Sequence, residues 1–212
     1  RVAGVRGGGG RGAVTPPERL HYDDARLTRF ESRVIAVLPG RVALAETAFY
    51  AEAGGQLADR GTLRFGGVSS RVSDVQVDDA GVVWHHTSDE LPEVGAPIEG
   101  EIELGRRLEH MALHSAQHLL SRALSDLGAN TVSARLGESA ATIDVDAPDL
   151  GRDELARALA SARRVISENR PVRAWFPTSG ELASLALRRA PKVSGRVRVV
   201  DLGGYDLTPC GG

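Results

Sequence analysis

The stretch RRLEHMALHSAQHLLSRALSDL, residues 106–127, marks the point where strand-like patterns give way to a helical one. Its apolar and small residues recur at steps of three and four, which predicts an amphipathic helix, and Gly128 follows as its stop. We therefore place a boundary between two parts of the chain near Leu104-Gly105. The stripe expected to face the core consists of Leu108, Met111, Ala112, Ser115, Leu119 and Ala123.

Upstream of this helix the sequence predicts short strands. Residues 33–38 (RVIAVL) and 41–45 (RVALA) are rich in β-branched side chains, and Pro39-Gly40 between them signals a hairpin turn. Strands this short and closely spaced favour a small β-barrel or curled sheet over residues 18–104. Further strands are expected at 68–77, 81–85 and 98–104.

Downstream of the helix, strands and helices alternate. Thr178 and Glu181 have capping-box spacing, which predicts the start of a short helix. The order of the expected strands and helices along the chain predicts an α+β protein. In it, residues 105–212 form a two-layer α/β sandwich with helices on a mainly antiparallel sheet. The expected elements are strands at 131–136 and 141–145, a helix at 153–169, a short helix at 182–190 and a strand at 196–202.

Composition excludes several classes of protein. The chain has 212 residues, of which 42% are hydrophobic and 25% charged, as in ordinary soluble globular proteins. No apolar run approaches the roughly 18 residues that a membrane span needs, and we expect no secretory signal. The single cysteine excludes an intrachain disulfide framework, so we expect a reducing, cytoplasmic setting.

Two segments have an unusual composition. Residues 1–17 are rich in glycine and arginine and end in Pro16-Pro17, which predicts a flexible tail that buries no core. Residues 151–200 carry eleven basic groups against four acids, although the whole chain has a net charge of −2. This segment could meet a polyanion, and the alternative is a solvated, arginine-rich helix face.

His114 and His118 are the strongest local signal for chemistry. Four residues apart on a helix, they project about 40° apart around the axis, and two imidazoles at that spacing can share a zinc ion. No glutamate follows His114, so the pair is not the HExxH motif of metalloproteases. The alternative is a pair of histidines at the edge of the core. His110, one turn earlier, is a weak candidate for a supporting contact.

Cys210 is the third candidate ligand. It lies between Pro209 and Gly211, in an expected turn that would expose its sulfur, and a thiolate suits zinc. Together with the two histidines it would leave a fourth position for water, substrate or another protein ligand. The alternative is that Cys210 is a small buried apolar residue.

The loop FYAEAGGQLADRG, residues 49–61, is a second candidate site. Gly54 and Gly55 allow a ligand or another backbone to approach closely, and Gln56 offers both a donor and an acceptor. The loop lacks the pattern of a phosphate loop, and the alternative is a bulged hairpin. Of the other histidines, we expect His85-His86 to be structural or to contact substrate, and His21 to lie on the surface.

Together these stretches resemble the alanyl-tRNA editing family, which comprises the freestanding AlaX proteins and the editing domain of alanyl-tRNA synthetase, with a related domain in threonyl-tRNA synthetase. The matching stretches follow the family's order and cover most of residues 19–212. They are FYAEAGGQLADRG at 49–61, GVVWHH at 81–86, RRLEHMALHSAQHLLS at 106–121, TVSARLGESAATIDVD at 131–146 and RVRVVDLGGYDLTPCGG at 196–212.

The resemblance implies one zinc ion per chain. The HxxxH pair of the family falls on His114 and His118, and its CxxxH pair falls on Cys210 alone. The fourth ligand of the family would lie just beyond Gly212, so we expect an incomplete ligand set in this sequence.

The resemblance also implies further site residues. Gln56 could orient water or substrate, and both it and Gln117 are expected catalytic residues. Gln117 could reach either a serine hydroxyl or a residue that supports a metal ligand. Gly54, Gly55 and Arg135 are expected to contact substrate, and at Arg135 related freestanding proteins often have histidine.

The implied reaction is hydrolysis of the ester that joins a wrong amino acid, serine or glycine, to the acceptor end of alanine tRNA. We expect a cytoplasmic hydrolase that acts in trans. No Ser-His-Asp set is evident, so a covalent acyl-enzyme is not expected. Two alternatives remain open, which are an editing region acting in cis within a synthetase and a non-catalytic, zinc-dependent tRNA-binding module.

Overall fold

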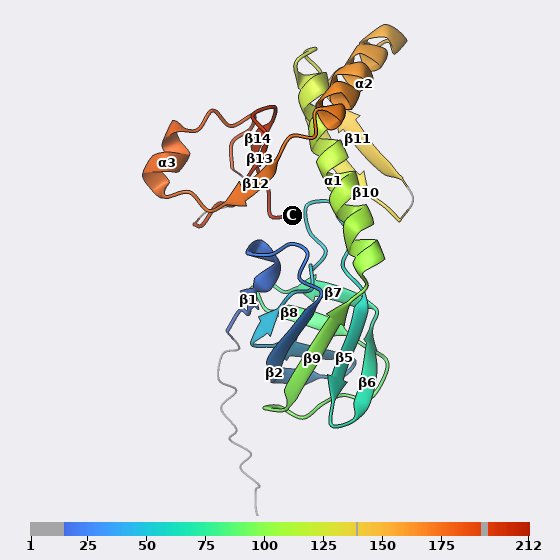
Figure 1. Ribbon diagram of the computed structural model, residues 1–212, viewed down its shortest axis with the longest axis vertical. Coiled ribbons are helices and arrows are strands. Elements are labelled where there is room, and N and C mark those ends of the chain that lie inside the picture. Colours follow the sequence, from blue (N-terminus) through green and yellow to red (C-terminus); the bar gives the residue numbers. More distant parts are fainter. Residues whose placement is uncertain (1–14, 139, 192–194) are drawn as a thin grey trace, which may run out of the picture.

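The computed structural model describes residues 15–138, 140–191 and 195–212. Of the predicted tail, residues 1–14 lie outside the described residues, whereas Pro17 is buried. The long helix α1 (Leu104–Ser125) divides the chain, with a sheet of short strands at one end and smaller sheets and helices around its other end (Figure 1). Within the described ranges, no helix combines the length and apolarity that crossing a bilayer requires.

Seven strands form one antiparallel sheet in the order β6-β5-β9-β2-β3-β8-β7. The predicted hairpin is confirmed, because β2 and β3 pair across Pro39-Gly40, and Gly40 takes a φ of 74° that costs glycine little. The strands are β2 (Arg29–Leu38), β3 (Arg41–Leu44), β5 (Gly61–Phe65), β6 (Val68–Val72), β7 (Asp74–Val77), β8 (Val83–His86) and β9 (Pro97–Ile102). The short strands β1 (Glu18–Arg19) and β4 (Glu46–Thr47) pair in parallel, and the 3-10 helix η1 (Leu20–Tyr22) follows β1.

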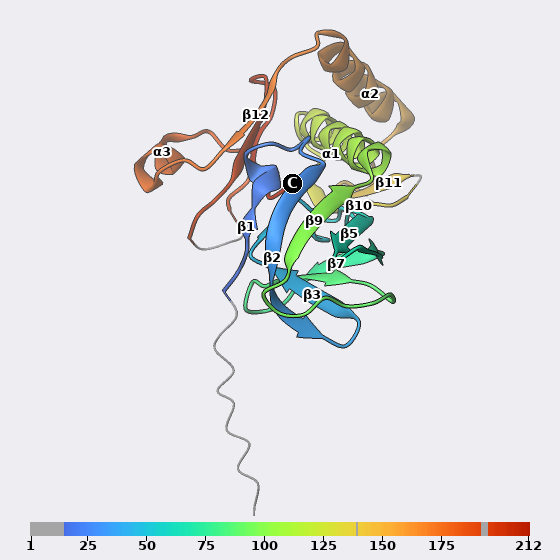
Figure 2. The same ribbon diagram turned by 60° about the horizontal axis from the view of Figure 1, so that its bottom comes forward.

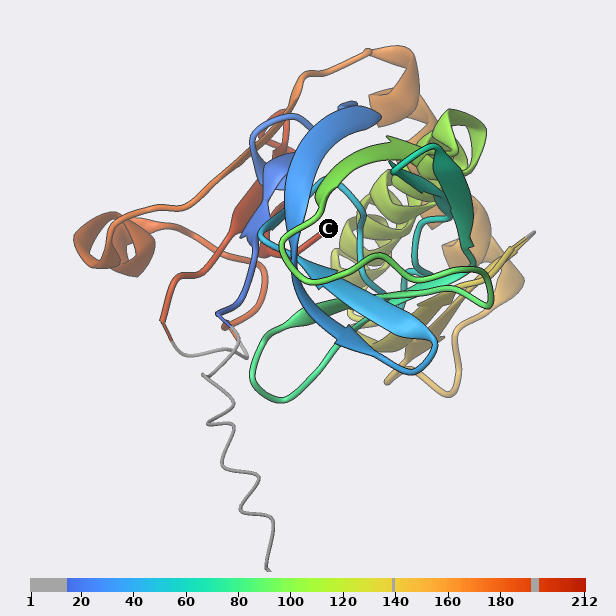
Figure 3. The same cartoon turned by 90° about the horizontal axis from the view of Figure 1, so that it is seen from below.

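This sheet curls strongly but is not a closed barrel, which corrects the barrel expectation. Figure 3 shows the strands bending around a common centre. The edge strands β6 and β7 have no ladder between them in the described part of the chain. They follow each other along the chain with Ser73 alone between them, so covalent bonds rather than hydrogen bonds join the two edges.

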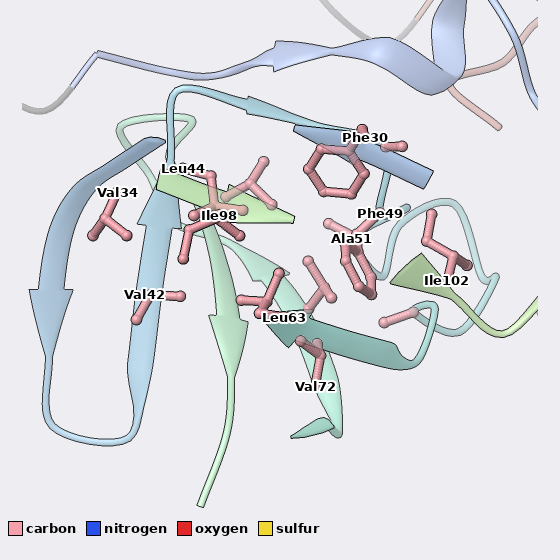
Figure 4. Close-up of a cluster of buried hydrophobic side chains, with 14 residues drawn as sticks. Phe30, Val34, Val42, Leu44, Phe49, Ala51, Leu63, Val72, Ile98 and Ile102 are labelled. Atoms are coloured by element: carbon pink, nitrogen blue, oxygen red, sulfur yellow. The ribbon is translucent and has the colours of Figure 1, made fainter. Parts of the chain in front are cut away.

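The interior of the curled sheet holds the main hydrophobic core (Figure 4). Phe30 packs there because Gly100 on the neighbouring strand β9 has no side chain, and a Cβ at that position would overlap the ring. Phe49, Ala51 and Ala58 are buried in the same core. The glycine loop between residues 51 and 58 is thereby anchored at both ends to the sheet.

The second part of the chain contains two small sheets rather than the single sheet expected. Strands β10 and β11 pair with each other, and β12, β13 and β14 form a separate antiparallel sheet. Figures 1 and 2 show these two sheets on different sides of α1. The elements are β10 (Thr131–Leu136), β11 (Ala141–Val145), α2 (Arg152–Ser167), β12 (Val172–Trp175), α3 (Ser179–Ser184), β13 (Val199–Leu202) and β14 (Leu207–Pro209).

The two sheets are separate because α1 and α2 pack between them. Leu119 of α1 packs with Ala162 of α2 and Val200 of β13 in one cluster. Leu124 of α1 packs with Ala158 of α2 in another, to which Val145 of β11 contributes. Burying both sides of the helix pair in this way requires a sheet on each side.

The capping box predicted for the short helix α3 is confirmed, but the helix begins at Ser179, three residues before the predicted start, and ends early. Thr178 and Glu181 form a reciprocal capping box at its start. The helix ends at Ser184, six residues before the predicted end at Ala190. The reason is a tertiary contact: the backbone N–H of Arg188 donates to the carbonyl of Leu207 at 2.8 Å, and its guanidinium pairs with Asp206.

Candidate metal centre

Helix α1 presents three histidines on its buried face. His110, His114 and His118 are all less than a tenth exposed, whereas Leu108 of the predicted stripe is 40% exposed. The stripe expectation is therefore wrong for the first half of the helix, where Leu108 and Met111 line a cleft instead. Periodicity identified an apolar face, but it could not show that the face borders a cavity.

Cys210 completes a cluster with two of these histidines. Its Sγ lies 3.2 Å from Nε2 of His114 and 3.4 Å from Nε2 of His118. The two imidazole rings are parallel, with 5.0 Å between their centres. All three potential ligand atoms lie within 4.8 Å of one another, so the predicted convergence of helix and C-terminal turn is present.

Each imidazole is oriented by a contact at Nδ1, while its Nε2 lies near Cys210. Nδ1–H of His114 donates to Oε1 of Gln56 at 2.7 Å, which leaves the Nε2 lone pair free toward Cys210. Nδ1 of His118 lies 3.5 Å from Oδ2 of Asp206, at ion-pair distance, and Arg188 holds that carboxylate from its other side at 2.7 Å. Metal-binding histidines are commonly oriented by carbonyl and carboxylate partners of this kind.

The charges of the cluster favour a thiolate. Burial would raise the pKa of Cys210, but hydrogen bonds and charge from His114 and His118 outweigh it and lower the pKa from 9.0 to about 5. For His118, burial opposes protonation, yet Asp206 and Cys210 together raise its pKa. Cys210 is therefore in the form that binds metals at neutral pH.

The donor set fits a zinc ion. Zinc–sulfur and zinc–nitrogen bonds of about 2.3 and 2.1 Å at tetrahedral angles would place a sulfur and a nitrogen about 3.6 Å apart, close to the observed separations. Two imidazoles and one thiolate are ligands that zinc prefers. Among the residues that the structure describes, the group has three members.

The glycine loop reaches the cluster because it docks on β10. Gly54 and Gly55 have positive φ angles of 59° and 85°, and a Cβ at Gly55 would overlap the carbonyl oxygen of Ala134. The N–H of Leu136 then donates to the carbonyl of Gly55 at 2.7 Å. The turn places Gln56, 3% exposed, against His114.

Comparison with known proteins gives the context for this geometry. A family model described as tRNA synthetases class II (A) matches residues 23–106. Curated alanine–tRNA ligases are similar along nearly the whole chain, with 36% identity over 93% of it in Thermofilum pendens and 35% over 96% in Pyrobaculum neutrophilum. The ligase of Thermococcus kodakarensis is 33% identical over 91%.

This chain is similar to one region of the alanine–tRNA ligases. The relationship confirms the resemblance that the motifs indicated. The chain spans 22–24% of the length of these relatives, so it matches one region of each ligase.

Two of the predicted site residues, Gln117 and Arg135, lie away from the cluster. Nε2 of Gln117 donates to Oγ of Ser121 at 2.7 Å. Arg135 is exposed on β10, opposite Thr142 of β11. Neither is among the described residues that line the cleft beside the cluster. Helical geometry explains the position of Gln117, because its side chain projects about 100° away from that of its neighbour His118.

The buried ion pair that joins α1 to the loop was not predicted from the sequence. Arg107 and Asp59 are almost fully buried and pair through the guanidinium Nε, with distances of 3.2 and 3.1 Å to the two carboxylate oxygens. Arg107 also donates to the carbonyls of Ala25 and Ala48 at 2.6 Å each. The N–H of Tyr50 donates to Asp59 at 2.6 Å, so the pair fixes the start of the loop against the helix.

A cleft of about 700 Å³ opens beside the cluster, between α1, η1 and the β12–β13 strands. His114, His118 and Gln56 line it, and so does His21. The expectation that His21 lies on the surface is wrong, since only 7% of it is exposed. His85 is structural, because it is buried in the sheet with Nε2 2.8 Å from Oγ1 of Thr47.

Proposed function

We propose that this chain is an aminoacyl-tRNA deacylase that hydrolyses the ester of serine or glycine wrongly attached to alanine tRNA. One observation carries the proposal: two imidazoles and a thiolate converge at the wall of a cleft, in a chain related to alanine–tRNA ligases. The cleft has the size of a site for a small molecule or for one end of a larger one.

The chemistry of alanine selection explains the need for such a site. A pocket that accepts alanine cannot reject glycine strongly, and it discriminates imperfectly against serine, because one missing or added group is worth about 1–3 kcal/mol. A second site that hydrolyses wrong products corrects these errors.

His114, His118 and Cys210 would hold a zinc ion in this site. When bound, zinc would supply Lewis acidity that polarises the ester carbonyl or lowers the pKa of water. Gln56 commits its Oε1 to His114, so we assign it the role of orienting that ligand. Asp206 has the corresponding role for His118.

Two settings fit the reaction. By itself the chain would act in trans, on tRNA already released from a synthetase. The alternative is action in cis within a longer synthetase, which is favoured by the finding that the chain corresponds to 22–24% of each matched ligase. The same residues would carry the chemistry in both settings.

The test is a deacylation assay with alanine tRNA charged with serine, glycine or alanine. We expect the zinc-loaded protein to release serine or glycine and to spare alanine. The double variant His114→Ala/His118→Ala should lose this activity and keep its far-ultraviolet spectrum, because both side chains line a cleft. The control His86→Ala, at a half-buried histidine in β8, should keep the activity.

Full activity in the double variant would contradict the proposal. So would binding of charged tRNA by the zinc-loaded wild type without any hydrolysis, which is the behaviour of a non-catalytic module. A chelator should abolish the release, and added zinc should restore it.

A further inference from the structure

His21 is a buried polar side chain for which the proposed reaction has no use. It lines the cleft with 7% of its surface exposed. Neither Nδ1 nor Nε2 has a hydrogen-bond partner within the described part of the chain. Buried polar atoms in native proteins are nearly always paired, so an unpaired imidazole in a cleft wall points to a ligand that pairs with it.

The state of His21 defines what it can bind. Burial and the charges of Arg107, Arg19 and Arg198 lower its pKa to about 3, so the ring is neutral near pH 7. A neutral imidazole offers one N–H donor and one acceptor nitrogen. Hydroxyl groups and the edges of nucleobases can satisfy both.

An aromatic and cationic surface adjoins His21. The Tyr22 ring lies 4.7 Å from the His21 ring and 5.3 Å from Phe176, in edge-to-face contacts. Arg198 lies over Tyr22 at 5.4 Å, and Arg196 lies over Phe176 at 4.3 Å. Both aromatic rings are only half-buried, so each keeps part of its surface open to a ligand.

Asp23 and Asp24 line the same cleft, so its charge is mixed rather than purely basic. Arg26, Arg107 and Arg198 line it as well, and Arg107 is already paired with the buried Asp59. Because the charges of this wall are mixed, we expect stacking and hydrogen bonding, more than net charge, to select the ligand there.

This surface is one aromatic ring away from the candidate metal centre. The Tyr50 ring lies 5.6 Å from the His21 ring. A Cβ placed on Gly212 would lie 2.9 Å from both the Tyr50 hydroxyl and Nδ1 of His114. In Figure 1 the C-terminus accordingly lies between α1 and the β12–β14 sheet, with η1 close by.

We propose that His21, Tyr22 and Phe176 form a subsite for the terminal nucleoside of a single-stranded RNA 3′ end. The inference rests on the proposed function for the class of its ligand. RNA ends are bound by stacking of unpaired bases on aromatic or arginine planes, with hydrogen bonds to base edges and ribose hydroxyls. Tyr22 and Phe176 would supply the stacking surface, and His21 the hydrogen bonds.

Binding of a short single-stranded RNA ending in CCA tests the subsite without requiring hydrolysis. We expect Tyr22→Leu and Phe176→Leu each to weaken binding at least about fivefold, the low end of the loss of one base–aromatic stack. The matched control Phe65→Leu, at a half-buried ring of the curled sheet, should bind as the wild type does. Removing the terminal adenosine from the RNA should weaken wild-type binding and leave the two variants unchanged.

Substitution of His21 separates hydrogen bonding from shape. His21→Gln keeps a donor and an acceptor and should retain most of the binding, whereas His21→Leu should lose it. Bound zinc and the melting temperature, measured for each variant, show whether the fold and the metal centre persist.

Wild-type affinity in folded Tyr22→Leu and Phe176→Leu would overturn the subsite, and it would leave the deacylase proposal standing if those variants still hydrolyse charged tRNA. Aromatic-dependent RNA binding in a protein without deacylase activity would support the subsite and overturn the proposed function instead.

Discussion

Single side chains decide how the two imidazoles present their Nε2 atoms. Gln56 holds His114 from a glycine turn. Asp206, which immediately precedes β14, holds His118 and is itself paired with Arg188. Asp206 has no exposed side-chain surface, so its carboxylate is committed to these two partners. These contacts restrict ring rotation before any metal binds, which reduces the entropy that binding costs.

We predict that Asp206→Asn weakens zinc binding about 10–100-fold, the usual effect of removing a carboxylate behind a metal-binding histidine. The measurement is a zinc titration against a competing chelator. Asp126→Asn is the matched control, since Asp126 also pairs with an arginine but lies about two turns beyond His118 on α1. Equal zinc affinities for the two variants would show that Asp206 does not support the site.

Among the elements, α1 carries most of the functional geometry. One face holds His110, His114 and His118, while Arg107 anchors its first turn to the loop that supplies Gln56. The approximate extent of this helix was predictable from periodicity. Its buried face was predictable only in the second half, where Leu119 and Ala123 are buried. In the first half it was not, because histidine and arginine are not counted as core residues when apolar spacing is read.

We predict that Arg107→Met lowers the free energy of unfolding by about 3–5 kcal/mol, because it leaves the Asp59 carboxylate buried without its partner. Urea unfolding measures the change. Arg122→Met on the same helix should cost no more than about 1 kcal/mol, since its ion pair with Asp126 is more than a third exposed. Similar losses in both variants would mean that the buried pair has no special role.

At the scale of the whole molecule, local and long-range features differ in how far the sequence predicts them. The β2–β3 hairpin, β10, β11 and the capping box of α3 follow from turn residues, alternation and cap spacing. The strands β12 and β14 were not predicted, because each is short and has little apolar alternation. The division into two small sheets depends on how α1 and α2 pack, which local patterns do not encode.

The candidate site shows the same division. The spacing of His114 and His118 is local, but Cys210 lies more than ninety residues further along the chain. Its residue type and expected turn made Cys210 a candidate ligand, but they left open the alternative of a small buried apolar residue, and the family resemblance favoured the ligand. Asp206 and Arg188 had no signal of their own, since each is one charged residue among many and matters only where the chain folds back.

X-ray absorption at the zinc edge of the zinc-loaded protein tests the central claim most directly, because it counts the sulfur and nitrogen atoms around the metal. We predict one zinc per chain with one sulfur at about 2.3 Å and two imidazole nitrogens at about 2.0–2.1 Å. The sulfur contribution should disappear in Cys210→Ser. Zinc surrounded by oxygen and nitrogen alone, or a wild-type protein that binds no zinc, would show that these three residues do not form a zinc site.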